Sequence, residues 1–529
     1  MNCRLTRRTV LLGSGVALSG IGLAGRGADA AAPPGTLVIG IAADPTGFDP
    51  EAVLNNTSGF VMATVFDSLM KYQPGTTDPM PGLAQSYAVS PDGLTYTFTL
   101  RPGVSFHDGT KLDAKTYIAG IDRLLNKADP SYIYNTGPVE GYIDFTYGSV
   151  ASYSAKDAMT VVFVLKEPNA PFLTSLAMVW NGVVSPAAAA KYGKDFRQHP
   201  VGTGPFIFRE WRPRDAILLD ANPAYWNGKP KVEKLVFQEY PDPSAGLLAL
   251  KNGDMHIWAD TNTELLPAIR ADRDLRVLTQ PGLAVSGVGM PCDTPPFTDV
   301  RVRQAFNYAV DKNAIDRALY RGLAVPMTSP LPASEWSFDP TLKGYPYDPE
   351  KAKALLSAAG VKRGLAVELL AYDSGRGYNP VGPDLAVAVQ GYLQKLGVAA
   401  TVRKIEFGAY LTTIRSAKYK GMFLVGWTGD NGDPDNFLNA LFGSTNIPIT
   451  DTVRYRNPTV DAIFVSALRS TDHETRVKLY RQAQRIILDD APWIFINSVL
   501  QARAVSDLVK GYQLNPTQMF FDMEKVSLA

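Results

Sequence analysis

Between residues 299 and 436 the sequence alternates between helix-like and strand-like segments, and this alternation restricts the fold more than any other feature. The strand-like segments 365–372, 398–407 and 421–427 are short and apolar, and helix-like segments at 382–397 and 408–419 separate them. Strands that alternate with helices of this length indicate βαβ units around a parallel sheet. The sequence therefore predicts an α/β fold.

Two helices are expected before the first of these strands. The segment 299–322 places Val302, Ala305, Phe306, Ala309 and Val310 on one helical face. The segment 347–360 has an aspartate at the N-cap position, a proline at the first helical position and a glycine as its stop.

The order of these elements places two loops at the same edge of the predicted sheet. In parallel α/β sheets, ligands bind at the edge formed by the carboxyl ends of the strands. Segment 373–380 follows the first strand, and segment 426–436, which reads GWTGDNGDPDN, follows the third. We therefore expect Arg376 and Asp430 to face one cleft.

The loop 426–436 contains three acids, and its spacing limits what they can do. A helix-flanked calcium loop needs acids at alternate positions followed by a glycine, but Leu438 occupies that glycine position. Acid/base catalysis by paired carboxylates stays open, because the sequence cannot place a second carboxylate. We interpret Asp433 and Asp435 as turn and helix-capping residues, and Asp430 as the acid nearest the cleft. Trp427 fits either a core position or an apolar ligand wall.

Signatures of catalysis and of metal binding are missing from the sequence. It contains no G-x-S-x-G elbow, H-E-x-x-H helix, C-x-x-C pair, phosphate loop or complete G-x-G-x-x-G. The histidines His107, His199, His256 and His473 are scattered, and Cys292 fits a buried thiol better than a nucleophile. This pattern favours a binding protein over an enzyme.

Residues 1–30 are typical of an export signal. A basic start that includes Arg7 and Arg8 precedes an apolar stretch and a small-residue end at 28–30. The two arginines resemble a twin-arginine signal, and the general secretory route stays open. Cys3 precedes the apolar stretch, so we expect no lipid anchor and a soluble periplasmic protein.

Without this signal the chain has about 500 residues, a length that usually divides into two or three lobes. It then has 48 basic and 50 acidic residues, a balance that does not suggest a nucleic-acid partner. Only Cys292 is left, so no internal disulfide is expected. Residues 76–204 read as an α+β lobe with antiparallel strands, including a hairpin at 86–106 that turns at Pro91-Asp92-Gly93.

Several motifs carry a family likeness. GTGPF at 202–206, ANPAYWNGKPKVEKLVF at 221–237, DVRVRQAFNYAVDKNAI at 299–315, RGYNP at 376–380 and GWTGDNGDPDNFL at 426–438 occur in order. Together they resemble the family 5 solute-binding proteins of peptide ABC transporters, most closely the dipeptide-binding branch. The likeness extends from about Gly35 to the C-terminus.

The resemblance implies a type II periplasmic binding fold that closes around a ligand by hinge motion. Lobe I would comprise residues 31–75, 205–285 and 505–529, the smaller inserted lobe 76–204, and lobe II 286–504. It also implies that Asp430 pairs with a peptide's α-ammonium and Arg376 with its α-carboxylate. Trp427, Thr428 and Gly429 complete the expected ligand site, with neither a metal nor a cofactor.

The implied function is capture of dipeptides or short peptides for an ABC permease in the inner membrane, by a monomeric receptor that is not an enzyme. Two alternatives stay open. One is a receptor for another small solute, such as glutathione, haem, a nickel complex or an amino-acid conjugate. The other is an exported hydrolase without a recognisable motif.

Overall fold

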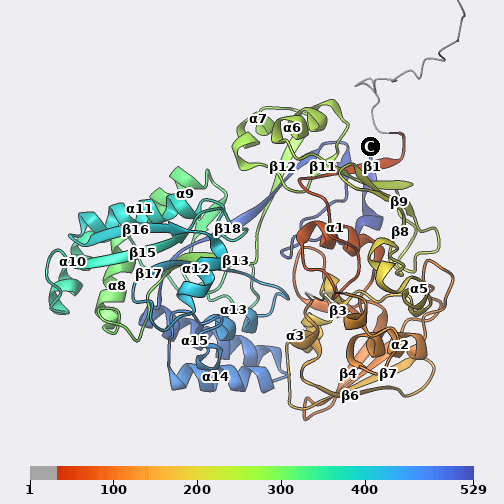
Figure 1. The fold of residues 1–529 in the computed structure, drawn as a ribbon, viewed down its shortest axis with the longest axis horizontal. Coiled ribbons are helices and arrows are strands. Elements are labelled where there is room, and N and C mark those ends of the chain that lie inside the picture. The colour runs from red at the N-terminus through yellow and green to blue at the C-terminus, as the bar shows by residue number, and fades with distance from the viewer. Residues whose placement is uncertain (1–32, 138, 140) are drawn as a thin grey trace, which may run out of the picture.

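The computed structural model describes residues 33–137, 139 and 141–529, so the predicted export signal lies outside the described residues. Figure 1 shows two bodies side by side, connected at one end by strands. Three of the hydrophobic cores define the parts of the molecule. We call them the β17 lobe, the β1 lobe and the small lobe.

The β17 lobe is built on a mixed sheet in the order β16-β15-β17-β13-β18. Strand β15 is parallel to both β16 and β17, which confirms the parallel arrangement predicted from the alternating segments. Strand β13 is antiparallel to its neighbours β17 and β18. The strands are β13 (Ala284–Gly289), β14 (Ala324–Pro326), β15 (Ala366–Tyr372), β16 (Ala399–Ile405), β17 (Met422–Thr428) and β18 (Trp493–Ser506).

Helices cover this sheet because their apolar residues recur at helical spacing. On α11, for example, Leu385, Ala386, Val389 and Leu393 are all fully buried. The helices are α8 (Val300–Ala309), α9 (Lys312–Leu319), α10 (Pro349–Ala358), α11 (Gly382–Lys395), α12 (Phe407–Ile414), α13 (Asp435–Phe442), α14 (Pro458–Arg469) and α15 (His473–Asp490).

One helix prediction was wrong in detail. Val310 is buried but extended, so it ends α8 and does not continue its helical face. The side chain of Asp311 accepts a hydrogen bond from the backbone of Ala314 and starts α9 as a new helix. In contrast, Asp348 caps α10 as expected, by accepting from the backbone of Lys351.

The β1 lobe continues the same sheet in the order β18-β11-β1-β10-β9-β8. Strand β1 lies between two parallel partners, β10 and β11, and its six residues are all buried. The elements of this lobe are β1 (Thr36–Ile41), α1 (Asn56–Val65), α5 (Pro186–Tyr192), β8 (Phe206–Arg212), β9 (Ala216–Ala221), β10 (Lys234–Glu239), α6 (Pro243–Asn252), β11 (Ile257–Trp258), α7 (Leu266–Arg270), β12 (Leu275–Pro281), β19 (Val509–Lys510) and β20 (Ser527–Leu528).

The small lobe contains a separate antiparallel sheet in the order β4-β5-β7-β6. Strands β4 and β5 pair across the turn at Pro91-Asp92-Gly93, which confirms the predicted hairpin. Its elements are β2 (Met70–Tyr72), β3 (Pro79–Pro81), β4 (Ala84–Val89), β5 (Thr95–Leu100), α2 (Ala114–Leu125), α3 (Ile143–Tyr147), β6 (Val150–Ala155), β7 (Thr160–Leu165) and α4 (Phe172–Ser175).

Strand β18 connects the two bodies. Its first part pairs with β13 in the β17 lobe, and its last part pairs with β11 and β12 on the side of the β1 lobe. In Figure 1 it runs as a long strand from one body to the other. The two bodies are therefore joined at one end by β12 and β18.

Candidate ligand-binding site

Asp430 lies between the end of β17 and the start of α13, and its carboxylate contacts Tyr142, the residue before α3. One carboxylate oxygen accepts a hydrogen bond from the hydroxyl of Tyr142, and the other accepts from Nδ2 of Asn436 at 3.2 Å. Burial raises the pKa of Asp430, and these two hydrogen bonds offset only part of the rise. Among the described residues no lysine or arginine is paired with Asp430. The carboxylate is thus partly removed from water without a cationic partner.

Asn436, which was not predicted from the sequence, orients both Asp430 and Trp427. It is buried in the first turn of α13, and its Oδ1 accepts from Nε1 of Trp427 at 3.1 Å and from the backbone N–H of Asp430 at 2.9 Å. The Trp427 ring packs half-buried against the core of the β17 lobe. It lies outside the lining of the two cavities beside Asp430 and Arg376, so the core position is the better description of Trp427 here.

Thr428, Gly429 and Asp430 line a small cavity of about 90 Å³. Leu54, Met178, Val179, Trp180, Met519 and Phe521 also line it, and among the residues that the structure describes Asp430 is the only charged one in its wall. A Cβ at Gly429 would lie 2.4 Å from the ring of Phe437, so only glycine fits at this position. The cavity places apolar surface directly beside the carboxylate.

Arg376 lies in a tight turn that follows β15. Its backbone N–H donates to the carbonyl of Asn379 at 2.9 Å, and the N–H of Asn379 donates back to the carbonyl of Arg376 at 2.8 Å. The guanidinium stacks on the ring of Phe407, 3.7 Å from its centroid. No carboxylate of the described chain is paired with Arg376.

The turn of Arg376 borders a second cavity, of about 380 Å³. Gly377 and Pro380 line this cavity together with residues 499–503 of β18. Gln518 lines both this cavity and the small cavity beside Asp430. The structure therefore brings the two predicted segments to adjoining cavities, although Arg376 and Asp430 do not contact each other.

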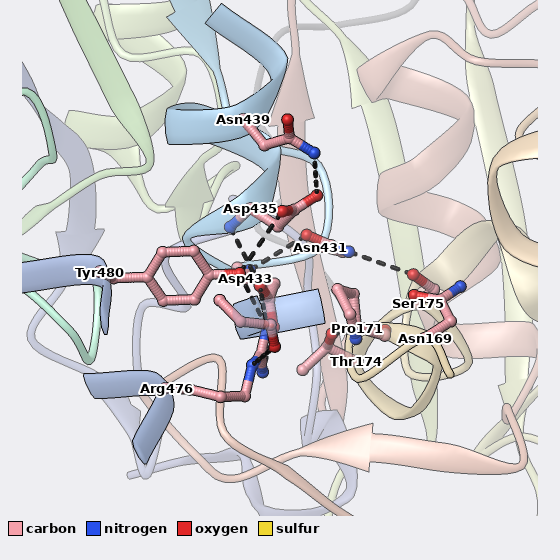
Figure 2. A network of polar contacts seen from close by, with 12 residues as sticks. Asn169, Pro171, Thr174, Ser175, Asn431, Asp433, Asp435, Asn439, Arg476 and Tyr480 are labelled. Carbon is pink, nitrogen blue, oxygen red and sulfur yellow. Dashed lines mark hydrogen bonds and ion pairs between the residues drawn. The ribbon is translucent and has the colours of Figure 1, made fainter. Parts of the chain in front are cut away.

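Asp433 has a larger role than the predicted turn and cap. It is fully buried and forms a two-point ion pair with Arg476 of α15, with oxygen–nitrogen distances of 2.7 and 2.9 Å (Figure 2). It also accepts from the backbone N–H of Asp435 at 3.0 Å, as a capping residue would. Asp435 itself begins α13 and caps nothing, and burial beside Asp433 raises its pKa to about 7.

The same loop forms hydrogen bonds with residues of β2, of the β2–β3 turn and of α4 in the small lobe. Tyr72 donates its hydroxyl to the carbonyl of Asn431 at 3.1 Å, and Thr77 donates to the carbonyl of Gly432 at 3.3 Å. Nδ2 of Asn431 donates to Oγ of Ser175 at 3.1 Å (Figure 2). These contacts hold Asp430 between the β17 lobe and the small lobe.

The residues considered for catalysis or metal binding do not gather at these cavities. Burial raises the pKa of Cys292 to about 12, and its thiol donates to the carbonyl of Met290 at 3.4 Å. Within residues 33–137, 139 and 141–529, no group of three His, Cys, Asp or Glu residues could hold a metal ion. In the same part of the chain, no helix has the length and apolar character required to cross a membrane.

Comparisons with known proteins identify the family of this chain. Residues 78–448 match the model of the bacterial extracellular solute-binding proteins, family 5. The chain is 33% identical to the dipeptide-binding protein of Escherichia coli (96% of this chain, 98% of the relative) and 34% identical to heme-binding protein A of Haemophilus influenzae (91% and 90%). It superimposes with a TM-score of 0.73, at 30% identity, on the ABC transporter-associated periplasmic binding protein DppA of Helicobacter pylori in complex with the peptide STSA (93% and 98%). Because the family model spans most of the chain, this protein belongs to the family 5 extracellular solute-binding proteins of bacteria.

Proposed function

We propose that this protein is the periplasmic receptor of an ABC importer and captures dipeptides or short peptides in the space between its two bodies. One observation carries the proposal: within the described chain Asp430 has no cationic partner and Arg376 has no acidic partner, and their segments border adjoining cavities. The peptide complex of the Helicobacter pylori relative supports the ligand class.

A short peptide is a zwitterion, and the two unpaired charges suit its two ends. A dipeptide spans about 7 Å when extended, so an anion and a cation at a fixed separation select for length as well as charge. In this proposal Asp430 binds the α-ammonium and Arg376 binds the α-carboxylate. Thr428 and Gly429 line the small cavity beside the ammonium.

Closure of the two bodies would strengthen both ion pairs. We infer that lobe I (31–75, 205–285 and 505–529), with the inserted lobe 76–204, closes against lobe II (286–504) about β12 and β18. Water leaves the cleft as it closes, and charge interactions are stronger where the surroundings are less polar. The receptor acts as a monomer, and after loss of its signal it delivers the peptide to an inner-membrane permease.

Isothermal titration calorimetry of the mature protein with alanyl-leucine, its N-acetyl derivative and its C-terminal amide tests the charge assignments. Arg376→Ala and Asp430→Asn should each weaken binding of the free dipeptide by about 2 to 5 kcal/mol, because each leaves the opposite charge in the cleft unpaired. Arg363→Ala and Asp384→Asn, which remove exposed charges from the same lobe, serve as matched controls. Full affinity in either site variant, with a normal circular dichroism spectrum, would overturn the assignment.

Similarity to heme-binding protein A makes haem the second candidate ligand. None of the four histidines lines either cavity, so a histidine axial ligand is not in place there. Titration with haemin, followed by the Soret absorbance, separates the two ligands. Tight haemin binding together with no heat from any di- or tripeptide would replace the peptide proposal.

A further inference from the structure

A buried tyrosine forms a hydrogen bond with the turn that contains Arg376. The hydroxyl of Tyr320, at the end of α9, donates to Oδ1 of Asn379 at 2.8 Å. Both side chains are buried, with exposed fractions of 4% for Tyr320 and 0% for Asn379. This contact joins α9 to the residue that closes the turn.

Asn379 fixes the turn through its backbone. Its N–H and C=O exchange two hydrogen bonds with the C=O and N–H of Arg376, so any displacement of Asn379 moves Arg376 with it. The Oδ1 of Asn379 accepts its hydrogen bond from Tyr320, and within the described part of the chain Nδ2 of Asn379 is buried without a hydrogen-bond partner. Burial raises the pKa of Tyr320 to about 12, and its hydroxyl therefore stays protonated and able to donate at neutral pH.

The same helix is tied to the strand that connects the two bodies. Oδ1 of Asp316 on α9 accepts from Nδ2 of Asn497 at 2.6 Å, and Oδ1 of Asn497 accepts from Oγ of Ser286 at 2.7 Å. Asn497 is the last residue of β18 that pairs with β13 before the strand leaves the β17 lobe. All three side chains are buried. A polar network thus runs from the connecting strand along α9 to the turn of Arg376.

We propose that Tyr320 is a positioning residue for carboxylate recognition: it fixes the Arg376 turn at the edge of the larger cavity, and Asp316 and Asn497 anchor that turn to the connecting strand. The inference rests on the proposed function, because it assumes that Arg376 binds the peptide carboxylate. Tyr320 also lines the larger cavity, but its hydroxyl is directed to Asn379, so removal of the hydroxyl leaves the ring's own surface in place.

The test compares the Kd values of alanyl-leucine and alanyl-leucine amide for the wild type, Tyr320→Phe and Arg376→Ala. Tyr320→Phe should weaken binding of the free acid roughly tenfold, because a buried amide loses its partner and the turn loosens. Binding of the amide should be unchanged. The ratio of the amide Kd to the free-acid Kd therefore falls toward the ratio found for Arg376→Ala. Tyr455→Phe, which removes a buried tyrosine hydroxyl bonded to Asp490 elsewhere in the same lobe, should leave the ratio at the wild-type value.

Each outcome separates the inference from the proposed function. If Arg376→Ala keeps the preference for the free acid, the carboxylate assignment itself fails. If Arg376→Ala removes the preference but Tyr320→Phe keeps it, or weakens acid and amide equally, Tyr320 is only structural and the inference is overturned. Should Tyr320→Phe not fold, Asn379→Ala keeps the backbone bonds of the turn and must reduce the ratio for the inference to stand.

Discussion

Tyr142, which precedes α3 and packs against the core of the β1 lobe, donates its hydroxyl hydrogen to the carboxylate of Asp430, although 288 positions separate the two residues in the sequence. The bond joins two parts of the molecule at the proposed ammonium site. Because a carboxylate has about four lone-pair positions, Asp430 can accept from Tyr142 and from a ligand at the same time. The hydrogen bond also lowers the pKa of Asp430 against the rise caused by burial.

Removal of this bond should shift the pH dependence of peptide binding. Tyr142→Phe leaves Asp430 buried with one donor fewer, so its pKa rises further and the carboxylate protonates at a higher pH. We expect the acid limb of the alanyl-leucine affinity profile to move to higher pH, with little change at neutral pH. Calorimetric titrations across the pH range measure the shift. An unchanged acid limb would show that Tyr142 does not tune Asp430.

The wild-type profile should itself be bell-shaped. Asp430 has a pKa above the ordinary 3.8, so as the pH falls through this raised pKa the carboxylate is neutralised and the ammonium loses its partner. At the other limb, affinity falls as the peptide's amino group, with a pKa of about 8, loses its proton. Asp430→Asn should remove the acid limb. Constant affinity in the wild type down to pH 3.8 would contradict the role of Asp430.

The buried ion pair between Asp433 and Arg476 should contribute most to the stability of the loop 426–436. The side chains are 0% and 8% exposed, so Arg476→Met leaves a carboxylate buried without its partner. We expect a loss of about 3 to 5 kcal/mol in the free energy of unfolding, measured by urea denaturation. Arg403→Met removes a two-point pair with Glu368 that is 44% and 37% exposed, and should cost about 0 to 1 kcal/mol. Similar losses in both variants would refute the argument from burial.

Gly432 should be the least replaceable residue of the loop. Its φ is +66°, and an added Cβ would lie 2.1 Å from Cβ of Thr77, so Gly432→Ala must push the loop away from its contacts around the small lobe. We expect weaker peptide binding and a lower melting temperature. Gly377→Ala, in the turn of Arg376, meets no atom within 4 Å and should keep the wild-type stability. Calorimetry and thermal unfolding of the two variants check this contrast.

The sequence predicted the parts of the fold that depend on local patterns. The parallel strands β15, β16 and β17 and the hairpin of β4 and β5 follow from short-range periodicity, and so do the two loops at the sheet edge. The break at Val310 was missed because a buried apolar residue satisfies the helical spacing whether or not the backbone is helical.

The partners of the site residues could not be predicted in the same way. Tyr142, Asn436 and Arg476 reach Asp430 or Asp433 through tertiary packing, and in two of the three cases the partner lies on a distant segment. Nothing local in the sequence distinguishes Tyr320 from the other tyrosines of the chain. The charge and pKa of the site carboxylates therefore depend on residues that only the three-dimensional structure brings together.

Strand β18 has a mechanical consequence. Where it crosses between the bodies it is paired with β12, from Pro281 opposite Leu500 to Leu275 opposite Ser506, so a two-stranded ribbon makes the crossing. Such a ribbon resists stretching and sideways shear far more than torsion. The two bodies are therefore expected to rotate relative to each other about this ribbon, and Arg376 and Asp430, which both follow strands of the β17 lobe, would move together. A pair of spin labels, one on each body, would therefore report this rotation as a change in the distance between them.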